Sequence, residues 1–234
     1  MRLLLTRPLA DSQRLAETLN ARGFDTLISP VIEILPLHVV IPDKPYQAVL
    51  LTSANAVDAL LASDQPNAIP VYCVGDATMA RLDTGRFLNL HSAAGDVMDL
   101  LGLLGRELHP ENGPILYLSG SVISRDIALD LGHDGFTVDR YVVYNAQPVH
   151  ELHEKVASAL RLGAVDGVLL SSTRSACLFL EMIARSDLTS ATHRLTAFCV
   201  SRATAEAVDQ ADWTKVLVAK KPTQESLLEM LPDS

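Results

Sequence analysis

The sequence has few cysteines, and their spacing excludes two kinds of site. Three cysteines occur among the 234 residues, and no two of them form a CxxC pair. An odd number without paired spacing argues against a disulfide framework and against a thiolate metal site. We therefore expect Cys73, Cys177 and Cys199 to be small buried side chains, and we expect no metal.

Long apolar runs and clustered basic residues are absent as well. The apolar stretches are short, such as residues 48–51, whereas a helix that crosses a bilayer needs about 20 apolar residues. The start, MRLLLTRPLADSQ, lacks the length and cleavage site of a signal peptide. The formal net charge is -9 and KK at 220–221 is the densest basic run, which argues against a nucleic-acid partner. We expect a cytoplasmic protein that binds neither membrane nor nucleic acid.

Several motifs of common catalytic sites are also missing. The sequence contains no GxGxxG after a strand, no GxxxxGK[ST] and no GxSxG, so dinucleotide-binding, P-loop and hydrolase sites have no local support. The segment SGSVISRD at 119–126 lacks the lysine of a P-loop. HELHE at 150–154 lacks the histidine spacing of HExxH, and a solvated helix start is the better interpretation.

What the sequence does contain is a repeated alternation of short apolar runs, small or polar turns, and helix-like segments. This rhythm predicts a parallel α/β architecture. One helix is expected after Asp11 or Ser12, either of which could cap it. The candidate strands are residues 3–6, 26–29, 48–53, 70–75, 87–91, 115–120, 137–144, 167–172, 195–201 and 215–220.

Three pairs of segments indicate an internal duplication. VLLTSANAV from residue 49 matches VLLSSTRSA from 168, and VYCVGDATMARL from 71 matches AFCVSRATAEAV from 197. GFDTLISPVIEI and GFTVDRYVVYNA form the third pair. Strand-turn-helix units can resemble one another for physical reasons alone, but three matches in the same order favour a tandem duplication with halves 1–113 and 114–234. Periodicity by itself would favour two consecutive domains.

Hydroxyls, glycines and a few arginines follow the predicted strands. In parallel α/β sheets, ligands bind at the carboxyl ends of the strands, where helix amino termini favour anions. Such a row suits carboxylate or phosphate groups, although serine and threonine also collect there simply as helix caps. The segments concerned are residues 6–7, 52–53, 75–78, 119–121, 171–174 and 201–204.

Taken together, these segments resemble the uroporphyrinogen-III synthase family. The resemblance covers nearly the whole chain and depends on the order and spacing of the pieces rather than on any one of them. The pieces are LLLTRPLADSQRLAETLNARGF, PVIEI, LLTSANAV, VYCVGDAT, ILYLSGSVISRDIAL, GFTVDRYVVYNA, LLSSTRSA, FCVSRAT and KKPTQESLLEML.

The resemblance implies an α/β fold with two parallel-sheet, flavodoxin-like domains, joined by a two-stranded linker in an interleaved duplication. One domain would be discontinuous, built from residues 1–35 plus 149–234, and the other would span residues 38–141. The linkers would be residues 30–37 and 141–148. Pairing of the strand LLLT within the sheet of residues 48–120 would exclude this interleaving.

The resemblance also implies a lyase of porphyrin and heme biosynthesis. Such an enzyme cyclises hydroxymethylbilane to uroporphyrinogen III with loss of water and inversion of the terminal ring D, without a cofactor. It would be a cytoplasmic monomer that receives its substrate from hydroxymethylbilane synthase. Two alternatives remain open: a non-enzymatic two-domain binder of a small polyanionic ligand, and a regulatory domain that has kept the fold and lost the activity.

Site residues follow by motif. Tyr144 matches the family's linker tyrosine and is expected to assist the loss of the hydroxyl, unless it only packs on the link. Tyr141 and Tyr144 would point to opposite faces of a regular strand. Ala54 and Thr173 stand where the family has a turn proline, and Ser201 replaces a glycine. The expected substrate-binding residues are Arg7, Ser53, Thr78, Ser119, Gly120, Ser121, Arg125, Ser172 and Thr204.

Overall fold

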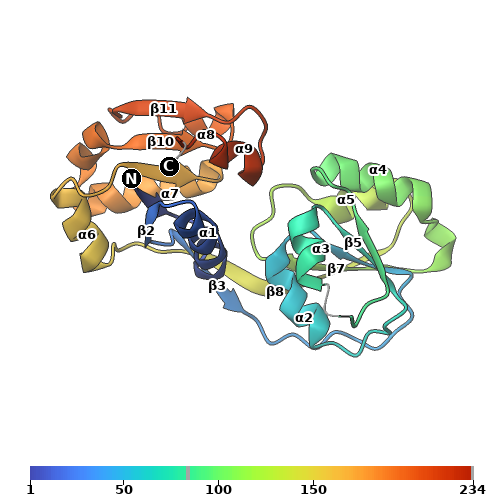
Figure 1. Ribbon diagram of the computed structural model, residues 1–234. Coiled ribbons are helices and arrows are strands. Elements are labelled where there is room, and N and C mark those ends of the chain that lie inside the picture. Colours follow the sequence, from blue (N-terminus) through green and yellow to red (C-terminus); the bar gives the residue numbers. More distant parts are fainter. Residues whose placement is uncertain (83–84, 233–234) are drawn as a thin grey trace. The chain divides into compact units, whose positions relative to one another are not determined.

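The chain folds into two compact units, shown in the computed structural model of Figure 1, which describes residues 1–82 and 85–232. Unit 1 comprises Met1–Glu33 and Gln147–Ser234, and unit 2 comprises Ile34–Ala146. The chain therefore passes between the units twice, once within strand β3 (Ile32–Pro36) and once within strand β8 (Val138–Pro148). These two strands are neighbours in one sheet.

Unit 1 contains a five-stranded sheet in the order β11-β10-β9-β1-β2. All its strand pairs are parallel. In Figure 1 the blue strands from the start of the chain lie in one sheet with the orange and red strands from its end. The strands are β1 (Arg2–Leu5), β2 (Asp25–Ile28), β9 (Gly167–Leu170), β10 (Thr196–Cys199) and β11 (Lys215–Val218). Their helices are α1 (Leu9–Ala21), α6 (Glu154–Arg161), α7 (Thr173–Arg185), the 3-10 helix η3 (Thr189–Arg194), α8 (Arg202–Glu206) and α9 (Gln224–Leu228).

Unit 2 contains a six-stranded sheet in the order β3-β8-β7-β4-β5-β6. Its other strands are β4 (Ala48–Leu51), β5 (Pro70–Cys73), β6 (Asn89–Ser92) and β7 (Ile115–Gly120). Its helices are η1 (Ala54–Ala56), α2 (Val57–Leu61), α3 (Asp76–Leu82), α4 (Val97–Glu107), η2 (Pro110–Asn112) and α5 (Ile127–His133).

The two sheets share one strand order, and this confirms the interleaved duplication. Apart from the edge strand β3, the series β8-β7-β4-β5-β6 repeats the series β2-β1-β9-β10-β11. In both series the opening βαβ unit of one half joins the strands of the other half, because β1 pairs with β9 and β7 pairs with β4. The strand LLLT is thus absent from the sheet of residues 48–120. Strand order 2-1-3-4-5 is that of flavodoxin-like folds.

The central strands explain why the apolar runs are continuous. Every residue of β4 and of β9 is buried, as expected when helices cover both faces of a parallel sheet. All ten predicted strands are present, but most end before the turn residues that the sequence pattern had included. The segment predicted as a link at 30–37 carries a strand of its own, β3.

The predicted cap of the first helix is wrong. Helix α1 begins at Leu9 after Pro8 and has no side-chain cap. Ser12 lies inside the helix, fully buried, and its hydroxyl donates to the Arg7 carbonyl at 2.8 Å. Proline is well suited to the start of a helix because it has no N–H to satisfy. Within the described residues, none of the helices combines the length and apolarity that crossing a membrane requires.

Candidate active site

The strand order of unit 2 places a topological switch point between β7 and β4, whose connections run to opposite sides of the sheet. In open α/β sheets a crevice forms at such a point, outside the carboxyl ends of the strands. A pocket of about 160 Å³ lies there. Four of the predicted site residues line it together, namely Ser53, Gly120, Arg125 and Tyr144.

The ring of Tyr144 lies directly against Gly120. A Cβ atom added to Gly120 would be 2.6 Å from Cε2 and Cζ of Tyr144 and 2.8 Å from its hydroxyl oxygen. Side chains do not approach one another this closely, so glycine is required for close approach and not for an unusual backbone angle. Tyr144 is 8% exposed, and the backbone of β7 lies against one side of its ring.

A bulge in β8 fixes the direction of the Tyr144 side chain. Ser119 pairs with Val142, whereas Gly120 pairs with Tyr144, so β8 has one more residue than β7 between these pairs. A bulge of this kind redirects the following side chain. Tyr141 and Tyr144 consequently pack against the same apolar cluster, and the opposite-face arrangement expected for a regular strand does not apply.

Arg140, on the neighbouring strand β8, is hydrogen bonded to the end of β7. Its Nε donates to the Ser119 hydroxyl at 2.8 Å, and its Nη2 donates to the Gly120 carbonyl at 2.9 Å. Ser119 itself is 1% exposed and does not line the pocket. Arg140 was not among the expected site residues, although an arginine within a predicted strand is a usable signal because charged side chains are rarely buried without a partner.

Tyr117 and Thr52 form a second polar pair in the pocket. Their hydroxyl oxygens are 3.2 Å apart, and burial raises the pKa of the Tyr117 phenol above its ordinary value. Tyr117 therefore stays protonated at neutral pH and can exchange hydrogen bonds as a neutral group. Tyr117 was not among the expected site residues, although the alternation of strand residues 115–120 places it on the same face as Ser119.

The predicted serines of unit 2 have structural partners. The Ser53 hydroxyl oxygen accepts a hydrogen bond from the Asn55 amide at 3.2 Å and caps η1, so the helix-cap interpretation of this turn is correct. Ser121 is hydrogen bonded through its hydroxyl to Asn145 at 2.6 Å, and its amide donates to the Tyr144 carbonyl at 3.0 Å. Thr78 is buried in α3 and is not among the residues that line the pocket.

Arg125 lines the pocket and forms an ion pair with Asp130. Its Nε and Nη2 donate to the two carboxylate oxygens of Asp130, at 2.5 and 3.1 Å. The hydrogen bond from Arg125 lowers the pKa of the Asp130 carboxyl. Both side chains reach solvent, so a ligand carboxylate would bind Arg125 in competition with Asp130.

Unit 1 places its three predicted residues after the adjacent strands β1, β9 and β10. Arg7 donates to Gln224 at 2.7 Å and to Asp11 at 3.2 Å. Ser172 caps α7 by accepting from the Ser175 amide at 3.1 Å. Thr204 is 1% exposed, with its hydroxyl 3.0 Å from that of Ser201. Helix capping thus accounts for Ser172 as it does for Ser53.

The described residues include no group of three or more His, Cys, Asp or Glu side chains that could hold a metal ion. Cys73 and Cys199 are buried, as expected, but Cys177 is partly exposed on α7, because its position faces away from the buried side of that helix. Within HELHE, His153 caps α6 by accepting from the Lys155 amide at 3.3 Å, which explains the motif as a helix start.

Comparison with known proteins gives one matching family model and one curated relative. The model describes "Uroporphyrinogen-III synthase HemD" and matches residues 13–229. The "Porphyrin biosynthesis protein HemD" of Ruminiclostridium josui is 26% identical over 247 residues, which cover 98% of this chain and 48% of the relative. The chain therefore spans about half the length of that relative.

Two solved structures have a similar fold. The uroporphyrinogen-III synthetase from Helicobacter pylori is 22% identical, with a TM-score of 0.64 and 98% of each chain covered. A mutant uroporphyrinogen III synthase from the extremely thermophilic bacterium Thermus thermophilus is 19% identical, with a TM-score of 0.55 and coverage of 98% of this chain and 96% of that one. At these identities the likeness concerns the fold alone.

Proposed function

Because the chain belongs to the uroporphyrinogen-III synthase family, we propose that it closes hydroxymethylbilane to uroporphyrinogen III, with loss of water and inversion of the terminal ring D. The observation that carries this proposal is the pocket at the carboxyl ends of β4 and β7, where Tyr144 rests on Gly120. This is the place where sheets of this strand order bind ligands.

In the first step the hydroxymethyl group on the first ring, at the opposite end of the substrate from ring D, loses its hydroxyl. The pyrrole nitrogen supplies the electron pair, the C–O bond breaks, and Tyr144 acts as general acid, giving its phenolic proton so that water departs. Positioned general acids of this kind accelerate a reaction by about a hundredfold to ten-thousandfold. The products are water, an electrophilic azafulvenium cation on the first ring and a phenolate on Tyr144, so the charges balance.

In the second step the substituted carbon of ring D attacks the azafulvenium carbon and forms a spiro intermediate. The bond from this ring D carbon to its original bridge carbon then breaks, and the free α carbon of ring D bonds to that bridge carbon, which inverts the ring. Loss of a proton restores the aromatic pyrrole, and that proton can return to Tyr144. The substrate itself supplies most of the chemical driving force. The protein therefore contributes mainly by holding a flexible chain in the reactive geometry, an effect worth up to about 7 to 11 kcal/mol in well-oriented intramolecular reactions.

Short neutral donors suit the carboxylates of this substrate. The hydroxyls of Thr52 and Ser53 line the pocket beside the Arg125 guanidinium, and hydrogen bonds to an ionised acceptor are about twice as strong as those between neutral groups. Arg140 positions the β7 end on which Tyr144 rests. In unit 1, the turns with Arg7, Ser172 and Thr204 offer further polar groups for the same purpose.

The finer parts of the proposal follow the family resemblance. We propose that the reaction needs no metal or cofactor, that the protein acts as a cytoplasmic monomer, and that hydroxymethylbilane synthase supplies its unstable substrate. We also propose that one domain spans residues 38–141, and that the other combines residues 1–35 with residues 149–234.

One assay tests the proposed activity. The purified protein, in the presence of a metal chelator, is given freshly generated hydroxymethylbilane, and the isomers are separated after oxidation. We expect the type III isomer, because unguided closure gives the symmetrical type I isomer. Formation of type I alone, at the rate of the buffer control, would contradict the proposal and would favour a binder or an inactive regulatory domain.

A further inference from the structure

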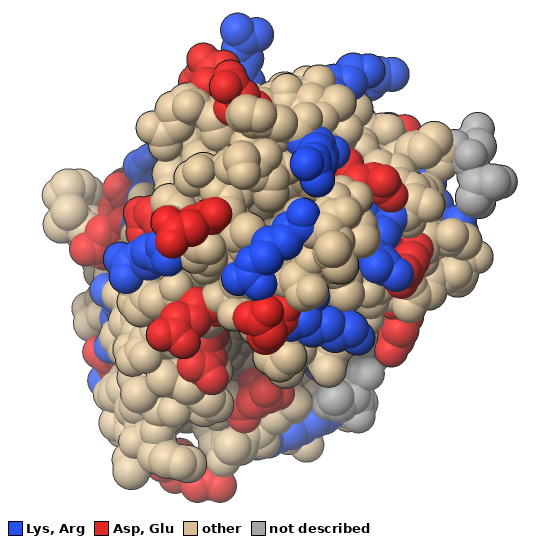
Figure 2. All heavy atoms as spheres, turned by 90° about the vertical axis from the view of Figure 1, so that its left-hand side faces the viewer, with Lys and Arg blue, Asp and Glu red and all other residues tan. Residues whose placement is uncertain are grey.

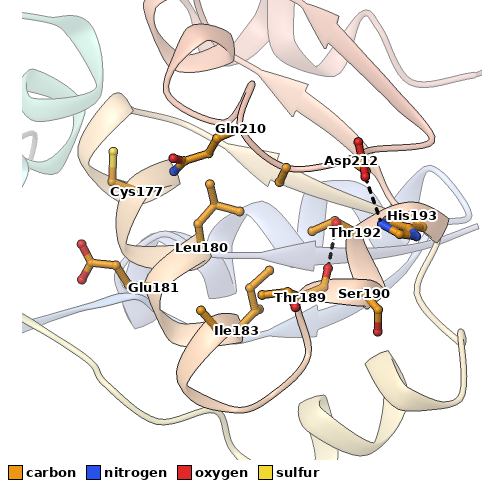
Figure 3. A pocket seen from close by; sticks show the side chains of 12 residues that line it. Cys177, Leu180, Glu181, Ile183, Thr189, Ser190, Thr192, His193, Gln210 and Asp212 are labelled. Carbon is orange, nitrogen blue, oxygen red and sulfur yellow. Dashed lines mark hydrogen bonds and ion pairs between the residues drawn. The ribbon is translucent and has the colours of Figure 1, made fainter.

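A second pocket, of about 660 Å³, lies within unit 1 and is separate from the strand-end turns. Its walls are α7, η3 and residues 210–212, as Figure 3 shows. Because η3 precedes β10 and residues 210–212 precede β11, the pocket lies toward the amino ends of these strands. Ser172 and Thr204 follow the carboxyl ends of β9 and β10, so nothing in the proposed reaction uses this pocket.

The lining of this pocket combines apolar side chains with acidic groups. Leu180 and Ile183 provide apolar surface together with Ala184 and Ala211, and Figure 3 shows Leu180 extending from α7 toward Gln210. The Asp212 carboxylate is 92% exposed and is 3.5 Å from Nε2 of His193. Among the described residues that line it, none is a lysine or an arginine.

The internal duplication offers a comparison within the same molecule. When the offset of the matching segments that begin at residues 71 and 197 is continued beyond their ends, Arg86 falls opposite Asp212 and Phe87 falls opposite Trp213. Arg86 precedes β6 just as Asp212 precedes β11, and these strands occupy the same place in the two sheets.

In unit 2 the Arg86 guanidinium binds the end of the helix that follows β4. It donates to the backbone carbonyls of Leu61, Ser63 and Gln65, at the end of α2 and in the loop that follows. In unit 1 the equivalent helix is α7, and the pocket is lined by its last turns and by Thr189 and Ser190 beyond it. The position that supplies a guanidinium in one unit thus supplies a carboxylate in the other.

Because the side-chain charge at this position is opposite in the two units, we propose that the unit 1 pocket binds a small organic cation. The cation would have a guanidinium or ammonium head on a short apolar stem. The head would pair with the Asp212 carboxylate in place of His193, and the stem would pack on Leu180 and Ile183. A volume of about 660 Å³ is within the usual range of small-molecule sites. The proposal does not depend on the reaction assigned to the strand-end turns.

Trp213 provides a direct reporter for this binding. It is the single tryptophan of the chain, it follows Asp212, and its Nε1 donates to the Val208 carbonyl at 2.9 Å. We would titrate the full-length protein with n-butylguanidinium and follow both Trp213 fluorescence and the heat of binding. The uncharged isostere n-butylurea is the matched ligand control.

The expected result is saturable binding of n-butylguanidinium to one site per chain, and no binding of n-butylurea. Asp212→Asn should weaken binding by about tenfold or more, since a charged hydrogen-bond partner is lost. Asp212→Arg should abolish it. Glu206→Gln, which removes an exposed carboxylate that pairs with Arg202 on α8, should bind as the natural sequence does. Circular dichroism and the unfolding midpoint establish that each variant is folded.

Three results would overturn the proposal: no saturable binding to the natural sequence, equal binding of the neutral isostere, or unchanged affinity in Asp212→Asn. If Asp212→Arg does not fold, the Asp212→Asn comparison decides the question alone. Formation of the type III isomer should be the same in Asp212→Asn and the natural sequence, which separates this site from the proposed reaction.

Discussion

At the scale of single residues, the contact between Gly120 and Tyr144 determines the shape of the pocket. The absence of one Cβ atom lets an aromatic ring lie against a strand backbone at a distance that any other residue would prevent. The identity of Gly120 is therefore coupled to the position of the Tyr144 phenol, and the two residues can be tested separately.

Tyr144→Phe should slow formation of the type III isomer by about tenfold or more, because the variant has no phenolic proton to give. The ring still packs on Gly120, so the unfolding midpoint should stay close to that of the natural sequence. Isomer analysis over time measures the rate. Full activity in a folded variant would remove Tyr144 from the mechanism.

Gly120→Ala should displace the ring rather than remove the phenol. The new methyl group would overlap Cε2 and Cζ of Tyr144, and overpacking of this kind costs about 1 to 3 kcal/mol of unfolding free energy. We expect both lower stability and lower activity. Gly132→Ala is the control, since a Cβ there meets nothing within 4 Å. Equal effects of the two variants would show that the contact is unimportant.

At the scale of secondary-structure elements, the pairing of β7 with β8 builds the site. The bulge between Val142 and Tyr144 redirects the ring, and Arg140 on β8 ties down the last residues of β7. The site therefore depends on how the end of β7 pairs with β8, and not on a single catalytic loop.

Arg140→Met should lower the unfolding free energy by about 1 to 3 kcal/mol, because the Ser119 hydroxyl and Gly120 carbonyl lose their charged partner. Denaturant unfolding measures this loss. Arg106→Met, on the exposed surface of α4, is the matched control and should change stability little. Type III formation should also fall in Arg140→Met, through misplacement of the Tyr144 ring, and an unchanged rate would argue against this positioning role.

Strands β5 and β6 and helix α4 share a polar contact that depends on pH. The Tyr72 hydroxyl donates to Glu107 at 2.9 Å, and its ring stacks on His91 with centroids 4.5 Å apart. Burial, followed by the hydrogen bond to Glu107, raises the pKa of Tyr72 from 10.0 to about 12. The folded state therefore keeps the phenolic proton at a pH where the unfolded state loses it.

Because the folded pKa of Tyr72 is raised, its contribution to stability is complete below pH 10.0 and declines as the pH rises toward about 12. At neutral pH, Tyr72→Phe should lower the unfolding free energy by about 1 kcal/mol. The difference between the two proteins should narrow above pH 10.0. Urea unfolding at a series of pH values measures it, and a difference that widens instead would contradict this assignment.

At the scale of the whole molecule, a protein with formal net charge -9 is proposed to bind a substrate with eight carboxylates. On the face shown in Figure 2, basic and acidic side chains are interspersed, without a large area of either sign. Long-range attraction cannot bring the substrate in, and capture must depend on local donors.

The apparent KM should therefore fall as salt is added. Screening shortens the Debye length from about 30 Å at 0.01 M to about 8 Å at 0.15 M ionic strength, which weakens the repulsion between protein and substrate. We expect a decrease of about twofold or more, while kcat changes little. Initial rates at several salt concentrations measure both, and a KM that rises steeply with salt would indicate a basic binding surface instead.

More of the fold than of the candidate site can be predicted from the sequence. Apolar runs such as those in β4 and β9 have one dominant environment, so their strands could be located without a structure. Thr78 and Ser119 were expected among the substrate-binding residues, but both are buried and neither lines the pocket. A motif gives the residue and the turn, but the bulge in β8 and the contacts of Arg140 arise from strand pairing that no local pattern records.

The interleaving of the two halves also affects the order in which the units can fold. Unit 2 is one continuous segment, Ile34–Ala146, whereas β1 can pair with β9 only after the ribosome has added residues as far as Gly167. Closing so long a loop is slow. During synthesis residues 1–33 can form the β1–β2 pair, but the edge of β1 that pairs with β9 should stay open while residues 34–146 fold first. In the cell, this open edge of β1 would be exposed to chaperones and proteases until β9 has been made.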